Sequence, residues 1–256
     1  MSEIQTIFTQ YQVSPFIGET FALLQQSKMQ KISIKGITSS ILTFINAALF
    51  EKSKQNLLFI LDDKESAAYA LNELENLLGK EKVFFFPASY RRPYEVEETE
   101  NANVLMRAEV LNAIFKAEDP IVILTYPDAL FEKVVTQATM AKNTLKIKIG
   151  DKLSTDFINE TLFEYQFKRV DFVTEPGEFS VRGGIIDIFS FSNDFPYRIE
   201  FFGNEVESIR TFDVATQLSI ETKKKITIIP NVENSFFQEN RESFLDYISP
   251  QTVIFI

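Results

Sequence analysis

The stretch of sequence that decides the fold is RVDFVTEPGEFSVRGGIIDIFSFSNDFPYRIEFFGNEVESIRTFD, residues 169–213. It alternates apolar and polar residues in three strand-length runs, and it contains the only double glycine of the chain, Gly183–Gly184. Because successive side chains of a strand point to opposite faces, Phe179 and Val181 share one face and Arg182 lies on the other. This alternation predicts antiparallel strands with one face on a core, and we expect the function of the chain to lie here.

The run Tyr197–Phe202 separates the two faces most clearly. Arg198, Glu200 and Phe202 alternate with apolar residues and therefore share one face of the predicted strand. Arginine, a carboxylate and an aromatic ring together have the composition of a binding surface. A half-exposed antiparallel sheet with a routine cross-strand ion pair accounts for the same pattern, so the pattern alone leaves both interpretations open.

Composition excludes several classes of function. The chain has 256 residues, 45% of them hydrophobic, which is enough to bury a core and to form two units. It has neither cysteine nor histidine, which excludes disulfides, thiol catalysis and a histidine-based hydrolytic triad, and we expect no metal site. The net charge of -10 argues against a broad phosphate-binding surface, because duplex binding needs clustered lysine and arginine.

A membrane role and an acidic metal site are both disfavoured. No apolar run approaches the ~20 residues that cross a bilayer, and Met1–Gln30 lacks the pattern of a signal peptide, so we expect a cytoplasmic protein with no membrane partner. The acidic cluster of the chain is Glu95, Glu97, Glu98 and Glu100. Acids in a solvated loop or in the first turn of a helix suit the helix dipole, and this explains the cluster without a metal.

The first half of the chain alternates strand and helix patterns. Predicted strands are Lys31–Ile34, Asn56–Leu61, Lys82–Phe86 and Ile121–Leu124, and predicted helices are Ser40–Glu51, Glu65–Leu78 and Asn101–Lys116. This rhythm implies a parallel sheet, so the expected fold class is α/β. From Thr144 onward strict alternation predicts a mixed α+β part with hairpins, one of them turning at Gly203–Asn204. The run Thr252–Ile256 is expected to return to the first sheet as a buried parallel strand, and the chain to continue beyond it.

A phosphate-binding loop with missing parts follows the first predicted strand. Such a loop reads glycine, four residues, glycine, lysine and then serine or threonine, between a strand and a helix. Gly36 and Thr43 stand at the first and last positions, while Ile41 replaces the second glycine and Leu42 replaces the lysine. Isoleucine cannot easily adopt the backbone conformations open to glycine, and leucine offers no charge to a triphosphate. The loop predicts weak nucleotide binding or none; an ordinary helix N-terminus with a serine or threonine cap gives the same pattern.

Four segments together resemble a known family. They are IKGITSSILTFINAALF (34–50), KVFFFPASYRRPYE (82–95), RVDFVTEPGEFSVRGGIIDIFS (169–190) and PYRIEFFGNEVESIRTFD (196–213). Over essentially all of its residues the chain resembles the N-terminal, UvrB-like module of the bacterial transcription-repair coupling factor Mfd. The last two segments are the most specific to this family. The first two are weaker individually, but the order of all four along the chain supports the resemblance.

The resemblance implies a degenerate RecA-like, P-loop-like parallel-sheet domain without ATPase capacity. An inserted α+β domain would interrupt it and bind UvrA, the damage-scanning ATPase of nucleotide excision repair. The expected boundaries are 1–131 for the first part of the RecA-like domain, 132–219 for the insertion and 220–256 for the return. The loop Pro87–Glu97 is far too short for the tyrosine-rich hairpin with which UvrB clamps damaged DNA, so damage verification is expected to be absent.

The same resemblance implies the docking residues. Positions that match those at which UvrB meets UvrA are Arg169, Arg182, Arg198 and Glu200, and Phe202 lies on the predicted strand face of the last two. Ser180 departs from UvrB, which has a second arginine at that position.

The expected function is protein docking in DNA repair. This module would recruit UvrA to stalled transcription complexes by mimicking UvrB, and it would be neither an enzyme nor a cofactor-binding protein itself. The parent would be an ATP-dependent DNA translocase whose motor domains lie beyond Ile256 and bind ATP and Mg. Other domains of the parent would bind RNA polymerase and DNA. Its C-terminal domains would contact this module. The alternative is a nucleotide-dependent, UvrB-like helicase or repair enzyme with a divergent phosphate loop. Leu42 favours the docking module over the nucleotide-dependent enzyme, because the lysine that it replaces is the charge that reaches the β and γ phosphates of a nucleotide.

Overall fold

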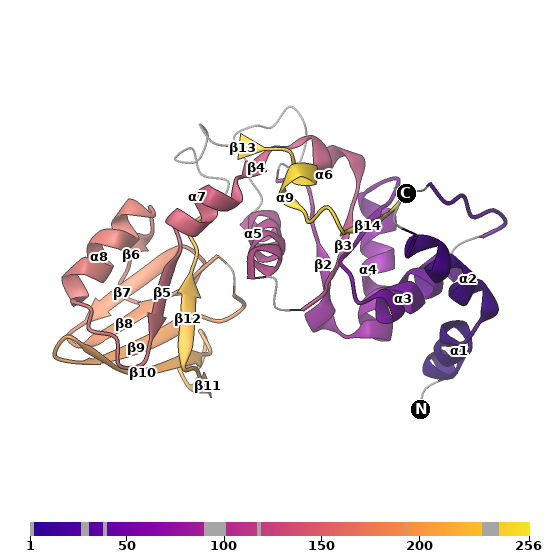
Figure 1. The fold of residues 1–256 in the computed structure, drawn as a ribbon. Coiled ribbons are helices and arrows are strands. Elements are labelled where there is room, and N and C mark those ends of the chain that lie inside the picture. Colours follow the sequence, from indigo (N-terminus) through magenta and orange to yellow (C-terminus); the bar gives the residue numbers. More distant parts are fainter. Residues whose placement is uncertain are drawn as a thin grey trace. The chain divides into compact units, whose positions relative to one another are not determined.

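The computed structural model describes residues 3–26, 31–37, 40–89, 101–116, 119–191, 193–231 and 241–256, which belong to two compact units (Figure 1). The first unit consists of Met1–Ala88, Ala113–Glu132 and Ile248–Ile256, and the second consists of Ser89–Asn112 and Lys133–Tyr247. The chain therefore leaves the first unit and re-enters it twice. Among the described helices, none is both long enough and apolar enough to cross a membrane.

A four-stranded parallel sheet with the strand order β14-β1-β3-β2 forms the centre of the first unit. Its strands are β1 (Leu57–Ile60), β2 (Val83–Phe85), β3 (Val122–Thr125) and β14 (Val253–Phe255). The helices of this unit are α1 (Glu3–Gln12), α2 (Pro15–Leu24), α3 (Ile41–Ser53), α4 (Lys64–Leu78), α6 (Pro127–Phe131) and the 3-10 helix η1 (Lys80–Lys82). Helix α5 (Asn101–Lys116) spans the boundary between the two units in the sequence.

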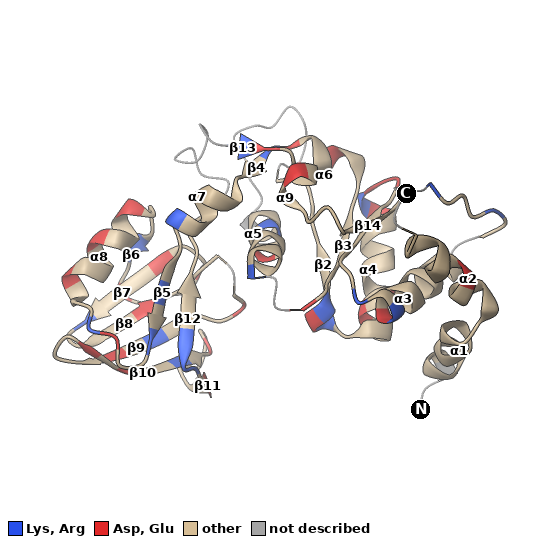
Figure 2. Cartoon of the chain, in the orientation of Figure 1, with Lys and Arg blue, Asp and Glu red and all other residues tan. Residues whose placement is uncertain are grey.

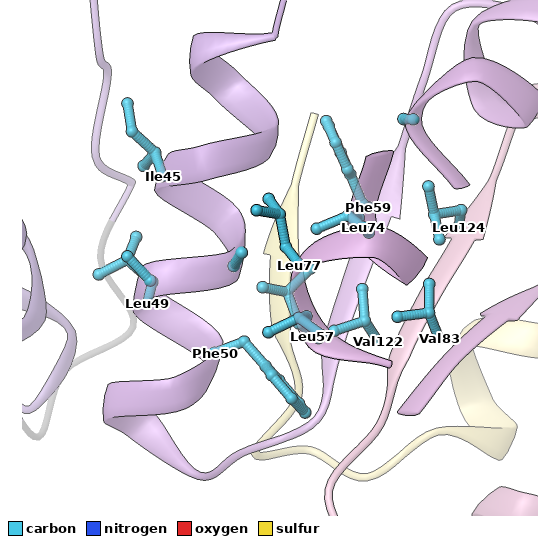
Figure 3. Close-up of a cluster of buried hydrophobic side chains, with 14 of the residues drawn as sticks. Ile45, Leu49, Phe50, Leu57, Phe59, Leu74, Leu77, Val83, Val122 and Leu124 are labelled. Carbon is cyan, nitrogen blue, oxygen red and sulfur yellow. The ribbon is translucent and has the colours of Figure 1, made fainter. Parts of the chain in front are cut away.

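Helices α3 and α4 share one hydrophobic cluster with the sheet (Figure 3). Its members include Ile45, Leu49 and Phe50 of α3, Leu57 and Phe59 of β1, Leu74 and Leu77 of α4, Val83 of β2, and Val122 and Leu124 of β3. Helix α4 begins after Asp63, whose carboxylate accepts a hydrogen bond from the Ser66 N–H at 2.7 Å. It ends at Gly79, where φ is 95°, a conformation that residues with a side chain rarely adopt.

Most predicted elements of the first unit are confirmed, with two corrections. The predicted strand Lys31–Ile34 is wrong, because these residues form no strand. Only two of its residues are apolar, and a strand inside a parallel sheet is buried on both faces and needs a continuous apolar run. The predicted burial of Thr252–Ile256 is also wrong: β14 does pair with β1 in parallel, but it is an edge strand, and Ile254 is 46% exposed.

The second unit contains a six-stranded sheet with the strand order β11-β10-β9-β8-β7-β6. Its strands are β6 (Lys168–Arg169), β7 (Glu178–Arg182), β8 (Ile185–Ile188), β9 (Tyr197–Phe202), β10 (Glu205–Phe212) and β11 (Ser219–Thr222). Only β6 and β7 pair in parallel; the other neighbours in this sheet are antiparallel. The fold is therefore mixed α/β, with a parallel sheet in one unit and a separate, largely antiparallel sheet in the other.

Smaller elements complete the second unit. Two-stranded pairings join β5 (Leu145–Lys148) to β12 (Lys225–Ile228) and β4 (Val134–Val135) to β13 (Arg241–Glu242). The helices are α7 (Gln137–Lys142), α8 (Thr155–Glu164) and α9 (Phe244–Tyr247). Because β12 and β13 pair with strands of this unit, the unit extends to Tyr247. The limits 132–219 for the inserted domain stay a prediction.

Two glycine turns position the central strands of the large sheet. Gly203, with φ of 62°, and Asn204 connect β9 to β10, as predicted. Gly184 lies close to β9, since a Cβ added to it would come within 3.0 Å of the Phe201 carbonyl oxygen. In the resulting register Ser180, Asp187, Arg198 and Arg210 form one row across β7, β8, β9 and β10.

Candidate functional site

The candidate site is the face of the six-stranded sheet that points away from the core, which we call the outward face. The opposite face buries Phe179, Ile186, Ile199 and Ile209 in the hydrophobic core of the second unit. The outward face carries the charged residues Arg182, Asp187, Arg198, Glu200 and Arg210. The predicted division of strands β7 and β9 into an apolar face and a polar face is confirmed.

Asp187 is the centre of the outward face. Its side chain is only 2% exposed, and it lies in the apolar strand β8. The Arg198 guanidinium donates two hydrogen bonds to it, from Nε to Oδ1 at 2.7 Å and from Nη2 to Oδ2 at 2.8 Å, and Arg182 Nη2 also donates to Oδ2. A buried carboxylate is costly unless it is paired, so the two arginines are what allow Asp187 to be there.

Arg198 and Arg182 differ in how completely their donors are used. Arg198 is 14% exposed, also donates to Gln217 Oε1 at 3.0 Å, and lies 4.3 Å from the centre of the Phe212 ring. Its hydrogen bonds to Asp187 raise the pKa of the guanidinium above its ordinary value. Arg182 is 38% exposed, and within the described part of the chain its guanidinium contacts only Asp187 and the Phe172 ring, 5.3 Å away. Arg182 therefore keeps donors available to a partner, whereas Arg198 serves the internal structure.

Glu200 belongs to a second, smaller group on the outward face. It accepts a hydrogen bond from Ser208 Oγ at 2.6 Å and from Arg210 Nη1 at 3.2 Å, and Arg210 Nη2 donates to its other oxygen. The Ser208 hydrogen bond, followed by the contact with Arg210, lowers the pKa of the Glu200 carboxyl. The cross-strand ion pair of the second interpretation is therefore present, and Phe202 on the same strand is an exposed aromatic ring, as the first interpretation requires.

The predicted docking residues are not all brought together. Phe202 is 80% exposed at the end of β9, in the same alternation as Arg198 and Glu200. Arg169 is exposed on the edge strand β6, where it pairs in register with Phe179, whose side chain faces the core. The register therefore places Arg169 on the other side of the sheet from Arg182.

Sequence reasoning considered Asp187 only as an alternative internal partner of Arg182, a contact that is present, and it missed Phe172. A lone carboxylate in the apolar run IIDI is a signal for Asp187, because such a residue needs a buried partner. Phe172, 62% exposed, gave no periodic signal because it lies in a loop. Ser180, which departs from UvrB, is 1% exposed and donates from Oγ to the Asp171 carbonyl at 2.9 Å.

The phosphate-loop pattern lies at the start of α3 in the first unit. Gly36 has a φ of 80°, and Thr43 is buried in the first turn of the helix. Ile41 is 40% exposed, and Leu42 packs against the hydrophobic cluster of the unit. The position of the missing lysine is therefore occupied by a side chain that contributes to the core.

A carboxylate of α4 occupies the polar side of this loop. Glu73 accepts hydrogen bonds from Ser40 Oγ and from Thr43 Oγ1, each at 2.5 Å. The open pocket beside it, of about 730 Å³, is also lined by Asp62 and Glu65. Carboxylates at a short distance repel a phosphate, so the pocket is electrostatically unsuited to a triphosphate.

Some predictions fall on residues that the structure does not describe. The acidic residues Glu95, Glu97, Glu98 and Glu100 are among them, as is most of the loop Pro87–Glu97. Within the described ranges no group of three or more acidic side chains could hold a metal ion.

Comparison with known proteins relates the central part of the second unit to a family. The family model of the UvrB interaction domain matches residues 145–233, which include β5, β12 and the whole six-stranded sheet. The transcription-repair-coupling factor of Bacillus subtilis (strain 168) is 31% identical over 201 residues, 78% of this chain and 17% of that protein. The one from Haemophilus influenzae is 29% identical over 179 residues, 70% of this chain and 16% of that protein. The UvrABC system protein B of Ureaplasma parvum is 28% identical over 227 residues, 83% of this chain and 34% of that protein.

The chain therefore contains a UvrB interaction domain, formed by the sheet that carries the outward face. Over most of its length it is a homologue of the transcription-repair-coupling factors, of which it spans less than a fifth.

Proposed function

We propose that this chain is a docking module that binds UvrA in nucleotide excision repair. The observation that carries the proposal is that the family match at residues 145–233 coincides with the outward face. There Arg182 keeps unused donors beside the exposed ring of Phe172, and Phe202 adds a second exposed ring. Aromatic and arginine side chains are the residue types that dominate binding energy at protein interfaces.

The proposal extends to the wider role implied by the relatives. The module recruits UvrA to stalled transcription complexes in the cytoplasm by presenting the surface that UvrB presents. RNA polymerase, ATP and Mg are bound by other parts of the parent protein, an ATP-dependent translocase. Damage verification is absent from this module.

The first unit has, in this proposal, a RecA-like fold without ATPase activity. Its parallel sheet and its phosphate-loop pattern support the RecA-like assignment. Leu42 in place of the lysine and the acidic pocket around Glu73 disfavour the alternative of a nucleotide-dependent helicase.

The experiment that tests docking is a titration of UvrA with the wild-type chain and with Arg182→Glu. Reversing this charge removes donors to a carboxylate on UvrA and adds repulsion, so affinity should fall by about 2 to 5 kcal/mol. The change also places a second carboxylate beside Asp187. Melting temperature is therefore measured on the same samples, and Arg182→Gln, which leaves the Arg198–Asp187 pair intact, is titrated in parallel. Unchanged affinity in both variants would defeat the docking assignment.

Phe202→Ala separates docking from stability more cleanly. Phe202 is 80% exposed, so its loss should change the free energy of unfolding by less than about 0.5 kcal/mol. Its loss should weaken UvrA binding by more than about 1 kcal/mol if the ring is buried at the interface. Phe131→Ala, at an 87% exposed position of the first unit, is the matched control and should leave UvrA binding unchanged.

A further inference from the structure

A ribbon of lysines lies on the second unit, separate from the outward face. Strands β5 and β12 pair antiparallel, with Lys225 opposite Lys148 and Thr227 opposite Lys146. Ile147, Ile226 and Ile228 of the same strands are buried in the core that the six-stranded sheet also covers. By alternation the lysines of these strands point away from that core, and they are exposed. We call Lys146, Lys148 and Lys225 the lysine ribbon, and Figure 2 shows basic segments on both strands.

The charges of the lysine ribbon repel one another. Lys148 and Lys225 stand directly across the two strands, and like charges in this arrangement destabilise a sheet. Lys148 Nζ lies 3.8 Å from Asp151 Oδ1, the limit of an ion pair, and 71% of its side chain is exposed. Within the described residues, Lys225 forms no ion pair. In a chain of net charge -10, an anion bound here would remove a repulsion that the fold otherwise carries.

We propose that the lysine ribbon binds the sugar-phosphate backbone of DNA. Lysine acts as a compact point charge toward phosphate, and the ribbon has neither the aromatic ring nor the guanidinium that would stack on or read a base. The contact is therefore weak, dependent on salt and indifferent to sequence or lesion. It is confined to two short strands, which agrees with the composition argument against a broad phosphate-binding surface.

An acidic protein surface is the competing occupant, and the composition of the ribbon favours DNA over it. Protein interfaces combine charged rims with a buried apolar or aromatic centre. The positions of β5 and β12 that point away from the core are Lys146, Lys148, Lys225 and Thr227, without an apolar residue among them. That is the composition of a backbone contact, and it contrasts with the outward face, where aromatic rings flank an arginine.

The test compares two double variants of equal charge. Lys148→Gln with Lys225→Gln neutralises the ribbon, and Lys64→Gln with Lys80→Gln neutralises two exposed lysines of the first unit as the matched control. Binding of a short fluorescent duplex is measured by anisotropy over a series of salt concentrations, and melting temperatures verify that each variant is folded. The ribbon variant should lose about tenfold in affinity at low salt, and the slope of log affinity against log salt should fall by about 2, or 0.9 for each lost contact. The control variant should keep the affinity and slope of the wild type.

Three outcomes would overturn the proposal. The first is absence of measurable binding by the wild type at low salt. The second is an equal loss in the ribbon and control variants, which would show that only the net charge matters. The third is tighter binding of poly-glutamate than of DNA by the wild type, lost in the ribbon variant, which would identify an acidic protein as the partner.

Discussion

The outward face of the second unit and the phosphate loop of the first unit hold their carboxylates in opposite ways. On the outward face, Asp187 and Glu200 each receive hydrogen bonds from arginine. At the loop, the hydrogen bonds that Glu73 receives from described residues come from the hydroxyls of Ser40 and Thr43, and the neighbouring Asp62 and Glu65 add negative charge. The first arrangement leaves a guanidinium presented outward, while in the second no cation among the described residues pairs with the Glu73 carboxylate.

This difference bears on which of the two sites is prepared to bind a partner. An internal carboxylate that positions an arginine prepares the arginine for a partner, because its side chain is already held in place. An internal carboxylate at a phosphate loop takes the hydroxyl donors that a nucleotide would need and repels its charge. Three predictions test the comparison.

The largest effect is expected for Asp187→Asn. The substitution leaves Arg198 with 14% exposure and no anionic partner, so the second unit should lose about 3 kcal/mol or more of its free energy of unfolding. Asp156→Asn, at an exposed position of α8, is the control and should cost less than about 0.5 kcal/mol. Chemical denaturation followed by circular dichroism measures both, and equal losses would show that Asp187 does not organise the face.

A smaller, pH-dependent effect is expected at Glu200. The Ser208 hydrogen bond and the Arg210 pair lower the pKa of Glu200 in the folded state below its ordinary value of 4.5. Its stabilisation is therefore fully present above pH 4.5 and is lost as the pH falls through the folded-state pKa. Glu200→Gln should cost less than about 1 kcal/mol near neutral pH, because the pair is open to solvent, and the difference from wild type should vanish in acid.

Denaturation curves for wild type and Glu200→Gln across this pH range measure that difference. Glu207→Gln, at an exposed position of the neighbouring strand β10, is the control. A difference that persists unchanged below the folded-state pKa would contradict the assigned role of the carboxylate.

No effect at all is expected when Mg-ATP is added. Leu42 supplies no charge, and Glu73 repels phosphate, so isothermal titration should detect no binding to the wild type. Glu73→Gln removes the repulsion but does not restore the lysine, and it should also fail to bind. A micromolar dissociation constant for the wild type would contradict the statement that the phosphate loop of the first unit cannot bind a nucleotide.

The fold was predictable wherever the hydrophobic period was strong. The continuous runs at β1 and β3 and the alternation at β7 and β9 were read correctly, because buried strands leave these patterns in the sequence. Lys31–Ile34 has strand propensity but too few apolar residues for a sheet buried on both faces. Whether β14 is central or at an edge depends on which strands neighbour it, and this is not encoded in its own residues.

The candidate site was predictable as a face but not as a network. Alternation places Arg198 and Glu200 together, and the register between strands then decides that Arg198 meets Asp187. That register depends on the turn at Gly183–Gly184 and on the hairpin at Gly203, so it could not be obtained from one strand alone. Glu73 was missed because it lies on a different helix from the loop whose hydroxyls it binds.

The pairing of β1 with β14 has a consequence for the order in which the chain folds. Leu57 pairs with Val253, and the whole second unit lies between them in the sequence. Closing so long a loop is slow, whereas the hairpins of the second unit join neighbouring segments and form quickly. During synthesis the six-stranded sheet of the second unit can therefore fold before β14 joins the sheet of the first unit. The surface proposed to bind UvrA is expected to form before the first unit is complete.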